Sequence, residues 1–270
     1  MELLEIERSL IKKYRKVLWS RFIRGINEYK MVNDGDKIAV CISGGKDSML
    51  MAKMFQELKR HGQVEFELVF FVMDPGYNEM NRGMVNKNLN ILGIDAHIFS
   101  SGIFGVVEDI AHDNPCYLCA RMRRGALYSE AKKLGCNKIA LGHHFDDVIE
   151  TIMLNILYAG EYKAMMPKLK STNFEGMELI RPLYYVKEED IIDWAKYCGL
   201  EFINCACIRT ANLCDTGEGK RKEIKRLIKS LKEVNPNVDI NILRSSENVS
   251  IDAIIGYKDG EEKVSFLDKY

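Results

Sequence analysis

Apolar and polar positions follow two rhythms along this chain, one typical of buried strands and the other of amphipathic helices. Short apolar runs bounded by turn residues predict four strands, at residues 37–42, 66–73, 96–99 and 138–141. Between them, apolar residues three or four positions apart predict helices, one opening at residue 47 and a later one at residues 148–157. Strands that alternate with helices form a parallel sheet with helices on both faces, so we expect an α/β fold.

The two ends of the chain carry patterns of their own. Residues 3–29 place apolar side chains at helical intervals with basic side chains between them, which predicts a basic amphipathic helix. A similar pattern predicts a helix at residues 220–234, after a short strand at 179–180 and a helix at 188–198. From residue 245 on, the pattern is weak. We therefore expect three parts: an N-terminal helix (1–32), an α/β domain (33–215), and a C-terminal helix with a tail (216–270).

The residues Ser43-Gly44-Gly45-Lys46-Asp47-Ser48 lie between the first predicted strand and the helix behind it. A glycine-rich turn that opens into a helix presents unpaired backbone N–H groups and the positive end of the helix dipole, which together favour phosphate. The common loop G-x-x-x-x-G-K-[ST] is excluded, because Asp47 follows Lys46 and Val40 occupies the position of its first glycine. An ordinary tight turn, in which the glycines only supply positive φ, is the simpler alternative.

Polar residues also follow the other predicted strands. Because the carboxyl ends of parallel strands meet at one edge of a sheet, Asp74 and Gly142 are expected beside the glycine-rich loop, in a nucleotide pocket. The helix after the fourth strand begins with Asp146 and Asp147, a position at which a carboxylate often caps the helix. For Asp147, a capping role and a role in the reaction are equally plausible. The two histidines before them fit contacts with phosphate or RNA, and equally a structural role.

Composition limits the class of protein. The chain has 270 residues with 39 basic and 39 acidic side chains, so a polyanionic partner must be bound by a local patch. No apolar run reaches membrane-spanning length, and the first residues lack the basic-then-apolar order of a signal peptide, so we expect a cytoplasmic protein without a membrane partner. In that compartment the eight cysteines are expected as thiols or metal ligands rather than disulfides.

Four cysteines form two close pairs. Cys116 and Cys119 are separated by two residues, and Cys205 and Cys207 follow far downstream. Such thiolates can hold a zinc ion or an iron–sulfur cluster, or form a redox pair, although Cys116 lacks the strand context of thioredoxin-like motifs. A structural zinc site with four sulfur ligands stays open, despite a C-x-C spacing tighter than is usual for zinc. The apolar surroundings of three others predict that they are buried, namely Cys41, Cys136 and Cys198, while Cys214 is undecided.

Several stretches together resemble the tRNA 2-thiocytidine synthetases, a family of PP-loop ATP pyrophosphatases. The stretches are residues 43–48, 116–125, 141–151, 163–168 and 180–183, and the resemblance extends from about residue 20 to residue 215. It implies an enzyme that uses ATP, Mg²⁺ and a 4Fe-4S cluster to replace the 2-oxygen of an anticodon-loop cytidine in tRNA with sulfur. The chain lacks the cysteine-rich zinc knuckles of the related 2-thiouridine enzymes, which favours the cytidine branch.

The resemblance also assigns roles to residues. It matches Cys116 and Cys119 with the first two cluster ligands and Cys205 with the third. The family's later pair is usually C-x-x-C, so the compressed spacing here leaves Cys207 as the alternative third ligand. Asp146 matches a carboxylate near ATP, which implies general acid–base chemistry or metal binding. Arg123, with Arg121 and Arg124, follows the cysteine pair and is expected to contact substrate or phosphate, the alternative being a solvated helix face.

The implied chemistry gives each loop residue a task. The 2-oxygen of a pyrimidine is a poor leaving group, so ATP must first adenylate it. Ser43, Gly44, Gly45 and Ser48 would donate to the departing pyrophosphate, while Lys46 supplies positive charge and Asp47 helps to hold magnesium. A cluster with three cysteine ligands leaves one iron open to carry sulfur, which a cysteine desulfurase or inorganic sulfide would donate.

Two other readings remain at this stage. Another PP-loop enzyme, such as a 2-thiouridine synthetase, a small-molecule sulfurtransferase or an amidating or lysidine-forming ligase, would combine the same loop with structural zinc. A nucleotide-binding module without enzymatic activity would use the same sheet. The sequence also leaves open whether two subunits form a homodimer.

Overall fold

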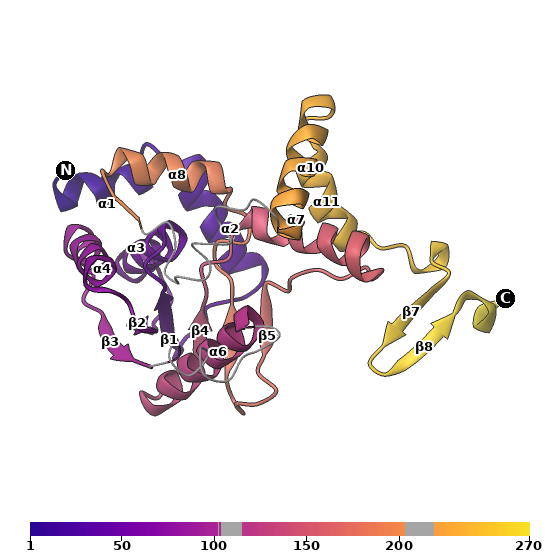
Figure 1. Cartoon of the computed structure of the whole chain (residues 1–270), viewed down its shortest axis with the longest axis horizontal. Helices are drawn as coiled ribbons and strands as arrows, with labels where there is room; N and C mark the ends of the chain where they lie inside the picture. The colour runs from indigo at the N-terminus through magenta and orange to yellow at the C-terminus, as the bar shows by residue number, and fades with distance from the viewer. Residues whose placement is uncertain (102, 104–114, 203–218) are drawn as a thin grey trace. The chain divides into compact units, whose positions relative to one another are not determined.

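The computed structural model describes residues 1–101, 103, 115–202 and 219–270. The chain divides into two compact units, one of Met1–Val148 with Met166–Gly219 and the other of Ile149–Met165 with Lys220–Tyr270. The first unit holds the large sheet and the N-terminal helices (Figure 1). The three-part division of the sequence stays a prediction.

A six-stranded sheet forms the centre of the first unit, with the strand order β3-β2-β1-β4-β6-β5. All neighbouring strands are parallel except the edge pair β5 and β6. The predicted parallel sheet is confirmed, whereas β5 was not predicted, because two of its three residues are lysines and it has no apolar run. The strands are β1 (Lys37–Ile42), β2 (Glu67–Asp74), β3 (His97–Ser100), β4 (Lys138–Ala140), β5 (Lys168–Lys170) and β6 (Glu178–Ile180).

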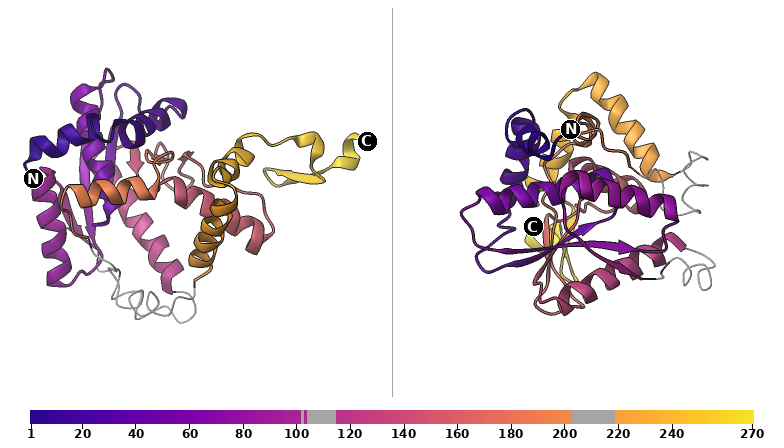
Figure 2. Two further views of the ribbon diagram at one scale, coloured as in Figure 1. Left: turned by 90° about the horizontal axis from the view of Figure 1, so that it is seen from above. Right: turned by 90° about the vertical axis from the view of Figure 1, so that its left-hand side faces the viewer.

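Helices cover both faces of this sheet, as predicted. Successive strand side chains point to opposite faces, so Val40 of β1 joins one core while its neighbours Ala39 and Cys41 join the other. The first core packs against α3 (Lys46–His61), α4 (Glu79–Leu92) and α8 (Glu188–Tyr197), and the second against α6 (Pro115–Lys133). The right-hand view of Figure 2 shows α3 and α6 on opposite sides of the strands.

The N-terminal segment is helical, but it is not the single helix that the pattern predicted. It consists of α1 (Leu3–Ile11), a π-helical turn η1 (Arg15–Trp19) and α2 (Ser20–Glu28). The wider turn begins where the N–H of Tyr14 donates to the carbonyl of Ser9, five residues back, at 2.8 Å. Its extra residue lets Leu18 face the same core as Leu10, and both are fully buried.

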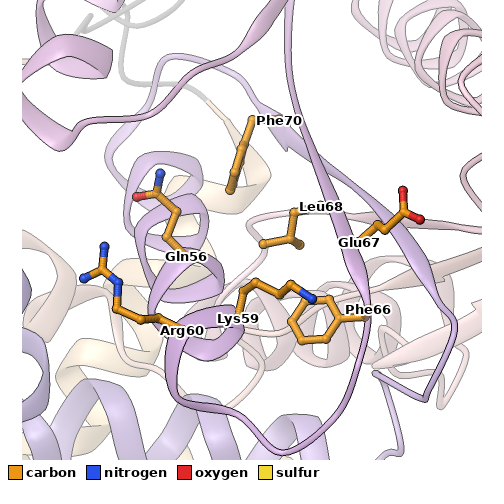
Figure 3. A pocket seen from close by; sticks show the side chains of 7 residues that line it. All are labelled: Gln56, Lys59, Arg60, Phe66, Glu67, Leu68 and Phe70. Atoms are coloured by element: carbon orange, nitrogen blue, oxygen red, sulfur yellow. The ribbon is translucent and has the colours of Figure 1, made fainter.

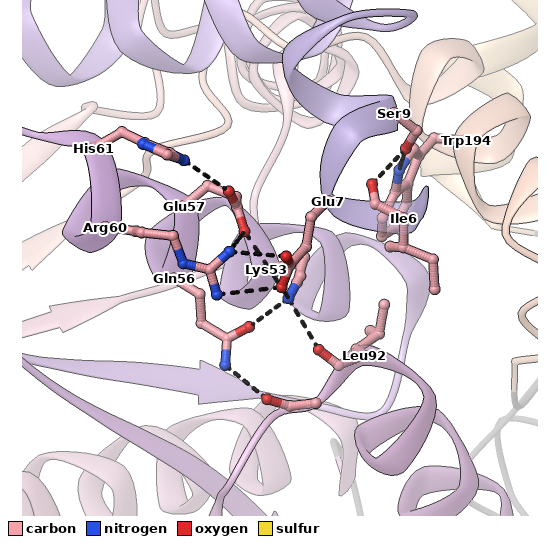
Figure 4. A network of polar contacts seen from close by, with 11 residues as sticks. Ile6, Glu7, Ser9, Lys53, Gln56, Glu57, Arg60, His61, Leu92 and Trp194 are labelled. Carbon is pink, nitrogen blue, oxygen red and sulfur yellow. Dashed lines mark hydrogen bonds and ion pairs between the residues drawn. The ribbon is translucent and has the colours of Figure 1, made fainter. Parts of the chain in front are cut away.

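A network of buried charges ties α1 to α3 (Figure 4). Lys53 is only 1% exposed, and its Nζ lies 2.8 Å from Oε1 of Glu7 and 3.0 Å from Oε1 of Gln56. Arg60 donates to the other oxygen of Glu7 at 2.8 Å. Glu57 lies 4.0 Å from Lys53. Buried charges of opposite sign therefore compensate one another at this contact.

The buried cysteines behave as predicted. Cys41, Cys136 and Cys198 are all buried in the first unit. Burial raises the pKa of Cys198 to about 12 and also raises the pKa of Cys41 and of Cys136. These thiols stay protonated at neutral pH, as packing residues rather than nucleophiles or metal ligands.

The second unit contains the end of α7 (Phe145–Leu154), a helix that starts in the first unit. The predicted helix at residues 220–234 is confirmed as α10 (Lys220–Val234). The tail from residue 245 on contains more structure than its weak pattern predicted. Its strands were not predicted because they are short and largely polar. The unit also holds η2 (Asn155–Ala159), α11 (Val238–Glu247), η3 (Ile251–Ala253), the antiparallel hairpin of β7 (Gly256–Asp259) with β8 (Glu262–Ser265), and η4 (Phe266–Lys269). None of the helices in the described ranges has the length and apolar character needed to cross a membrane.

Candidate active site

The glycine-rich loop, residues 43–48, joins β1 to α3 in the predicted strand–turn–helix arrangement. Gly44 has a φ of 81°, a conformation that side chains disfavour, and Gly45 is the N-cap of α3. The loop is closed by Ser48, whose Oγ accepts from the N–H of Ser43 at 3.1 Å and donates to the carbonyl of Gly45 at 2.9 Å. The first N–H groups of α3 have no partners within their helix, as an anion site requires.

Gly142 lies directly against this loop, as the sheet topology predicted. A Cβ at Gly142 would lie 3.0 Å from the backbone N of Ser48 and 3.2 Å from the carbonyl carbon of Asp47. Real Cβ atoms rarely approach a backbone so closely. Glycine two residues after β4 therefore lets the loop lie this close without a shift of the backbone, and a role for Gly142 in holding nucleotide stays a prediction.

Lys46 stands at the first position of α3, between two carboxylates. Its Nζ is 3.0 Å from Oε1 of Glu188 and 3.2 Å from Oδ1 of Asp47. Burial alone would lower the pKa of Lys46, but the two carboxylates raise it above its ordinary value. Lys46 is therefore a cation at every physiological pH. Sequence reasoning missed Glu188, since an acidic residue at the start of a helix is common and gave no sign of this contact.

Asp47 is a half-buried carboxylate whose hydrogen bonding within the protein is incomplete. Its Oδ1 has no hydrogen bond, although it lies near Lys46 and 3.8 Å from Nε2 of His144. Burial raises the pKa of Asp47, and the nearby cations offset this only in part. An underbonded carboxylate beside a phosphate loop is suited to a divalent cation. Within residues 1–101, 103, 115–202 and 219–270, no three His, Cys, Asp or Glu side chains group to hold a metal, so phosphate oxygens and water would supply the other ligands of the cation.

Asp146 and Asp147 open α7 and have different partners. Asp147 accepts from the backbone N–H of His144 at 3.1 Å, and its own N–H donates to Nδ1 of His144 at 3.4 Å, which is the geometry of a helix cap. Asp146 instead accepts from the backbone N–H of Glu188 at 2.7 Å. It thereby holds the start of α8, and Glu188 with it, beside Lys46. An acid–base or metal-binding role for Asp146 stays a prediction.

Asp74 shapes the turn after β2. Its Oδ1 accepts from the N–H groups of Gly76 and Tyr77 at 2.9 and 2.7 Å, and its Oδ2 pairs with Arg82. Burial alone would raise the pKa of Asp74, but these donors lower it below its ordinary value. The turn brings the hydroxyl of Tyr77 to the carbonyl of Ser43, to which it donates at 3.0 Å. Tyr77, which the sequence did not single out, thus supports the loop, and contact of Asp74 with adenosine stays a prediction.

Comparisons with known proteins agree with this geometry. Residues 18–209 match the model of the PP-loop domain. Proteins named tRNA-cytidine(32) 2-sulfurtransferase are 35% identical in Geobacter metallireducens and 37% identical in Geotalea daltonii. The matches cover 88% of this chain and 91% of the first relative, and 90% of this chain and 94% of the second. The chain belongs to the tRNA-cytidine(32) 2-sulfurtransferase family of PP-loop proteins.

A solved structure shares the fold. The U34-tRNA thiolase NcsA from Methanococcus maripaludis, determined with its 4Fe-4S cluster, superposes with a TM-score of 0.66. The two chains are 22% identical, and the match covers 84% of this chain and 76% of the thiolase. At this identity the likeness supports the PP-loop fold alone.

Helix α6 carries further predicted site residues, on the face of the sheet opposite to α3. Cys119 is half-buried and packs against a small cluster that contains Met73, near the carboxyl end of β2. Arg123, one turn later, is half-buried. Burial raises the pKa of Tyr77, and the positive charge of Arg123 partly offsets this increase. Cys116 begins the same helix, but its side chain lies outside the described residues, as do Cys205 and the alternative Cys207. The structure therefore leaves the predicted ligand set untested.

Arg181 is a second cation at this edge that sequence reasoning passed over. It follows β6 directly, is buried, and donates to the carbonyl of Met166. Its Nε is buried without a hydrogen bond. Burial, with the nearby Arg124, lowers the pKa of Arg181 to about 10. A charged guanidinium with an unused donor at the carboxyl end of the sheet is suited to a phosphate or carboxylate ligand.

A pocket of about 530 Å³ lies elsewhere on the first unit (Figure 3). It is lined by the end of α3 and the start of β2, namely Gln56, Lys59, Arg60, Phe66, Glu67, Leu68 and Phe70. Arg60 follows Lys46 by fourteen residues in α3, which places the pocket about 20 Å from the PP-loop at 1.5 Å per residue. This pocket is separate from the site described above.

Proposed function

We propose that this protein is an ATP-dependent tRNA sulfurtransferase that replaces the 2-oxygen of cytidine 32 with sulfur. The observation that carries the proposal is the PP-loop with Lys46 at the start of α3, in a chain that matches the tRNA-cytidine(32) 2-sulfurtransferases along nearly their whole length. Such an enzyme would act in the cytoplasm on folded tRNA.

The first step is adenylation. The 2-oxygen of the cytosine attacks the α-phosphorus of ATP, the bond to the β-phosphate breaks, and pyrophosphate leaves. The N–H groups at the start of α3 and the cation of Lys46 would stabilise the charge that gathers on the leaving group. Asp47 would hold Mg²⁺ together with phosphate oxygens, because its Oδ1 has no hydrogen bond in the protein.

The second step exchanges oxygen for sulfur. Sulfide attacks C2 of the cytosine, the bond from C2 to the adenylated oxygen breaks, and AMP leaves with that oxygen and the electron pair. No change in oxidation state is needed when sulfide is the nucleophile. Arg123, half-buried near the loop, and Arg181 would bind phosphate groups of the activated nucleotide.

We propose that three cysteines hold an iron–sulfur cluster. Cys116 and Cys119 stand three positions apart at the start of α6, a spacing that brings helical residues to one face, and Cys119 is half-buried near β2. With Cys205, or Cys207 in its place, they would hold a 4Fe-4S cluster. When bound, such a cluster supplies an iron without a protein ligand, which can carry the sulfide that a cysteine desulfurase or inorganic sulfide donates.

Cysteine variants test the cluster. We expect Cys116→Ala to lose iron, its visible absorbance and thiolation of tRNA, while ATP binding stays intact. Cys136→Ala, which removes a buried packing thiol, is the matched control and should keep all four. Stoichiometric zinc in anaerobically purified protein, or full thiolation by the Cys116→Ala variant, would contradict the cluster.

The substrate is tested independently of the cluster. Mass spectrometry of tRNA nucleosides from cells without this protein should show the loss of 2-thiocytidine alone. Loss of a thiouridine, or no change in any thionucleoside, would contradict the proposed base.

A further inference from the structure

The N-terminal segment concentrates positive charge. Residues 8–27 contain seven basic side chains and no acidic one, in a chain whose net charge is zero. Four of the seven lie within five residues, where α1 gives way to η1, and all four are exposed. These four, with one exposed lysine of α8, are called the basic patch here: Lys12, Lys13, Arg15, Lys16 and Lys196.

The patch differs from the other cations of the same segment. Arg21 is bound to Asp190 at 2.7 Å, and Arg24 is bound to Glu28 at 2.9 Å. The cations of the patch make no ion pair within the part of the chain that the structure describes. Arg21 therefore connects the N-terminal segment to α8, and Arg24 makes an ion pair within the segment. The cations of the patch, in contrast, are available to bind an anion from outside the protein.

Aromatic rings accompany the cations. Tyr14 and Tyr197 meet edge to face, with ring centroids 5.8 Å apart. Nζ of Lys13 lies 3.6 Å from the ring centroid of Tyr197, which is itself 39% exposed. Exposed cations beside aromatic rings are typical of surfaces that bind nucleic acid, since they contact both phosphates and bases.

Helix α8 connects the patch to the active site. Its first residue, Glu188, pairs with Lys46 of the PP-loop, and its last, Tyr197, packs against Tyr14. At 1.5 Å per residue the two ends lie about 14 Å apart. Figure 1 shows α8 beside α1 along this path. An RNA with one nucleotide in the active site would therefore present further phosphates within reach of the patch.

A membrane surface fits the segment less well. A basic helix that lies on a bilayer needs a free apolar face to insert. The apolar side chains of this segment, including Ile6, Leu10, Leu18 and Phe22, are fully buried in the core of the first unit.

We propose that the basic patch binds the phosphate backbone of the tRNA outside the nucleotide that reacts. This inference rests on the proposed function, since it assumes a tRNA substrate. It assigns the patch to affinity and orientation, while the PP-loop carries out adenylation. Because each contact releases counterions from the RNA, binding through the patch should depend strongly on salt.

The test compares two variants with four charges removed. One carries Lys12→Gln, Lys13→Gln, Arg15→Gln and Lys16→Gln. The control carries Lys59→Gln, Lys87→Gln, Lys132→Gln and Lys133→Gln, four exposed lysines elsewhere on the first unit. Filter binding with unmodified tRNA transcript, repeated across salt concentrations, gives the dissociation constant and its salt dependence. Binding of ATP by each variant verifies that the PP-loop is intact.

We expect the patch variant to bind tRNA about tenfold more weakly at 0.1 M salt and to show a salt slope smaller by about 2 to 3, while the control changes little. Equal affinity and equal slope in the two variants would overturn the inference. Loss of binding to phosphatidylserine vesicles without loss of tRNA binding would overturn it too, and would assign the patch to membranes. Patch-dependent tRNA binding by a wild-type protein that thiolates no cytidine would support the patch and refute the proposed function.

Discussion

Two clusters of charged side chains lie along α3. At the start of the helix, Lys46 and Asp47 belong to the PP-loop, and in its second half Lys53 and Arg60 bind Glu7 of α1. Both clusters pair cations with carboxylates at about 3 Å. They differ in how fully the protein compensates the negative charge of the carboxylate, Asp47 in the first cluster and Glu7 in the second.

The pKa values show the difference. The hydrogen bond from Arg60 lowers the pKa of Glu7, and Lys53 adds to this, so together they outweigh the burial that would raise it. For Asp47 the balance is reversed, and burial raises the pKa despite His144 and Lys46. Both oxygens of Glu7 are bonded to cations and Glu7 contributes to stability, whereas Oδ1 of Asp47 lacks a hydrogen bond. The incomplete compensation of Asp47 is consistent with the cation site proposed beside the PP-loop.

The largest effect is expected at Lys46. Lys46→Ala should lower the kcat for tRNA thiolation by about 10²–10³, because it removes the cation that stabilises the leaving pyrophosphate. Release of pyrophosphate measures the step directly. Iron content should be unchanged. Lys59→Ala, an exposed lysine near the other end of the same helix, is the control, and a similar loss there would erase the contrast between the two ends.

At the other cluster a comparable change should affect stability and not chemistry. Lys53→Met removes the more buried of the two cations that lie 2.8 Å from the buried Glu7, which should cost about 3–5 kcal/mol in the free energy of unfolding. Urea denaturation measures this loss. The double variant Lys53→Met/Glu7→Gln should recover part of it, because the buried carboxylate charge is gone. If Lys53→Met instead abolished thiolation by the folded protein, the two clusters would not have separate tasks.

Gly142 allows a smaller perturbation of the loop alone. Gly142→Ala places a methyl group 3.0 Å from the backbone N of Ser48, so the loop must shift by a few tenths of an ångström. We expect a loss of about 1–3 kcal/mol in stability and a KM for ATP about tenfold higher. Gly83→Ala, on α4 with no atom within 4 Å, should leave both unchanged or improve stability slightly. An unchanged KM in the Gly142→Ala variant would argue against close packing at this loop.

The smallest expected effects are those of the ionisation of Glu7 and Asp47 on folding stability, and they have opposite signs. The pKa of Glu7 is lowered in the folded protein, so its contribution to stability is present above its unfolded pKa and is lost as the pH falls through the folded value. The pKa of Asp47 is raised, so the ionised form costs stability at neutral pH.

Melting curves at pH 7 therefore separate the two carboxylates. Glu7→Gln should lower the melting temperature, and Asp47→Asn should leave it equal or higher while ATP turnover falls. A lower melting temperature in both variants would show that Asp47, like Glu7, is stabilised by its partners.

The sequence predicted the parts of this structure that depend on local patterns. Strand β1 with the loop after it, and helices α8 and α10, each begin at the predicted residue, because turn chemistry and apolar spacing determine them within a few residues. The edge strand β5 and the hairpin of β7 with β8 were missed, since short polar strands are defined by their partners and not by their own pattern.

In the candidate site, too, the features that depend on local pattern or sheet topology were predictable, and the tertiary contacts were not. The neighbourhood of Gly142 and the loop followed from sheet topology, and Asp147 has the cap geometry that was one of its two readings. Tyr77 and Glu188 reach the loop only through tertiary contacts, which no local signal announces. The partners of Asp146 and Asp74, a helix start and a turn, were likewise invisible in the sequence.

The edge strand β5 has a consequence beyond the site. A parallel sheet with two apolar faces could add strands from another molecule at any long, bare border. Here the edge strand β5 is three residues long and antiparallel to β6, and its sequence is Lys168-Leu169-Lys170. A lysine on each side of the leucine therefore opposes pairing of β5 with the same strand of another molecule.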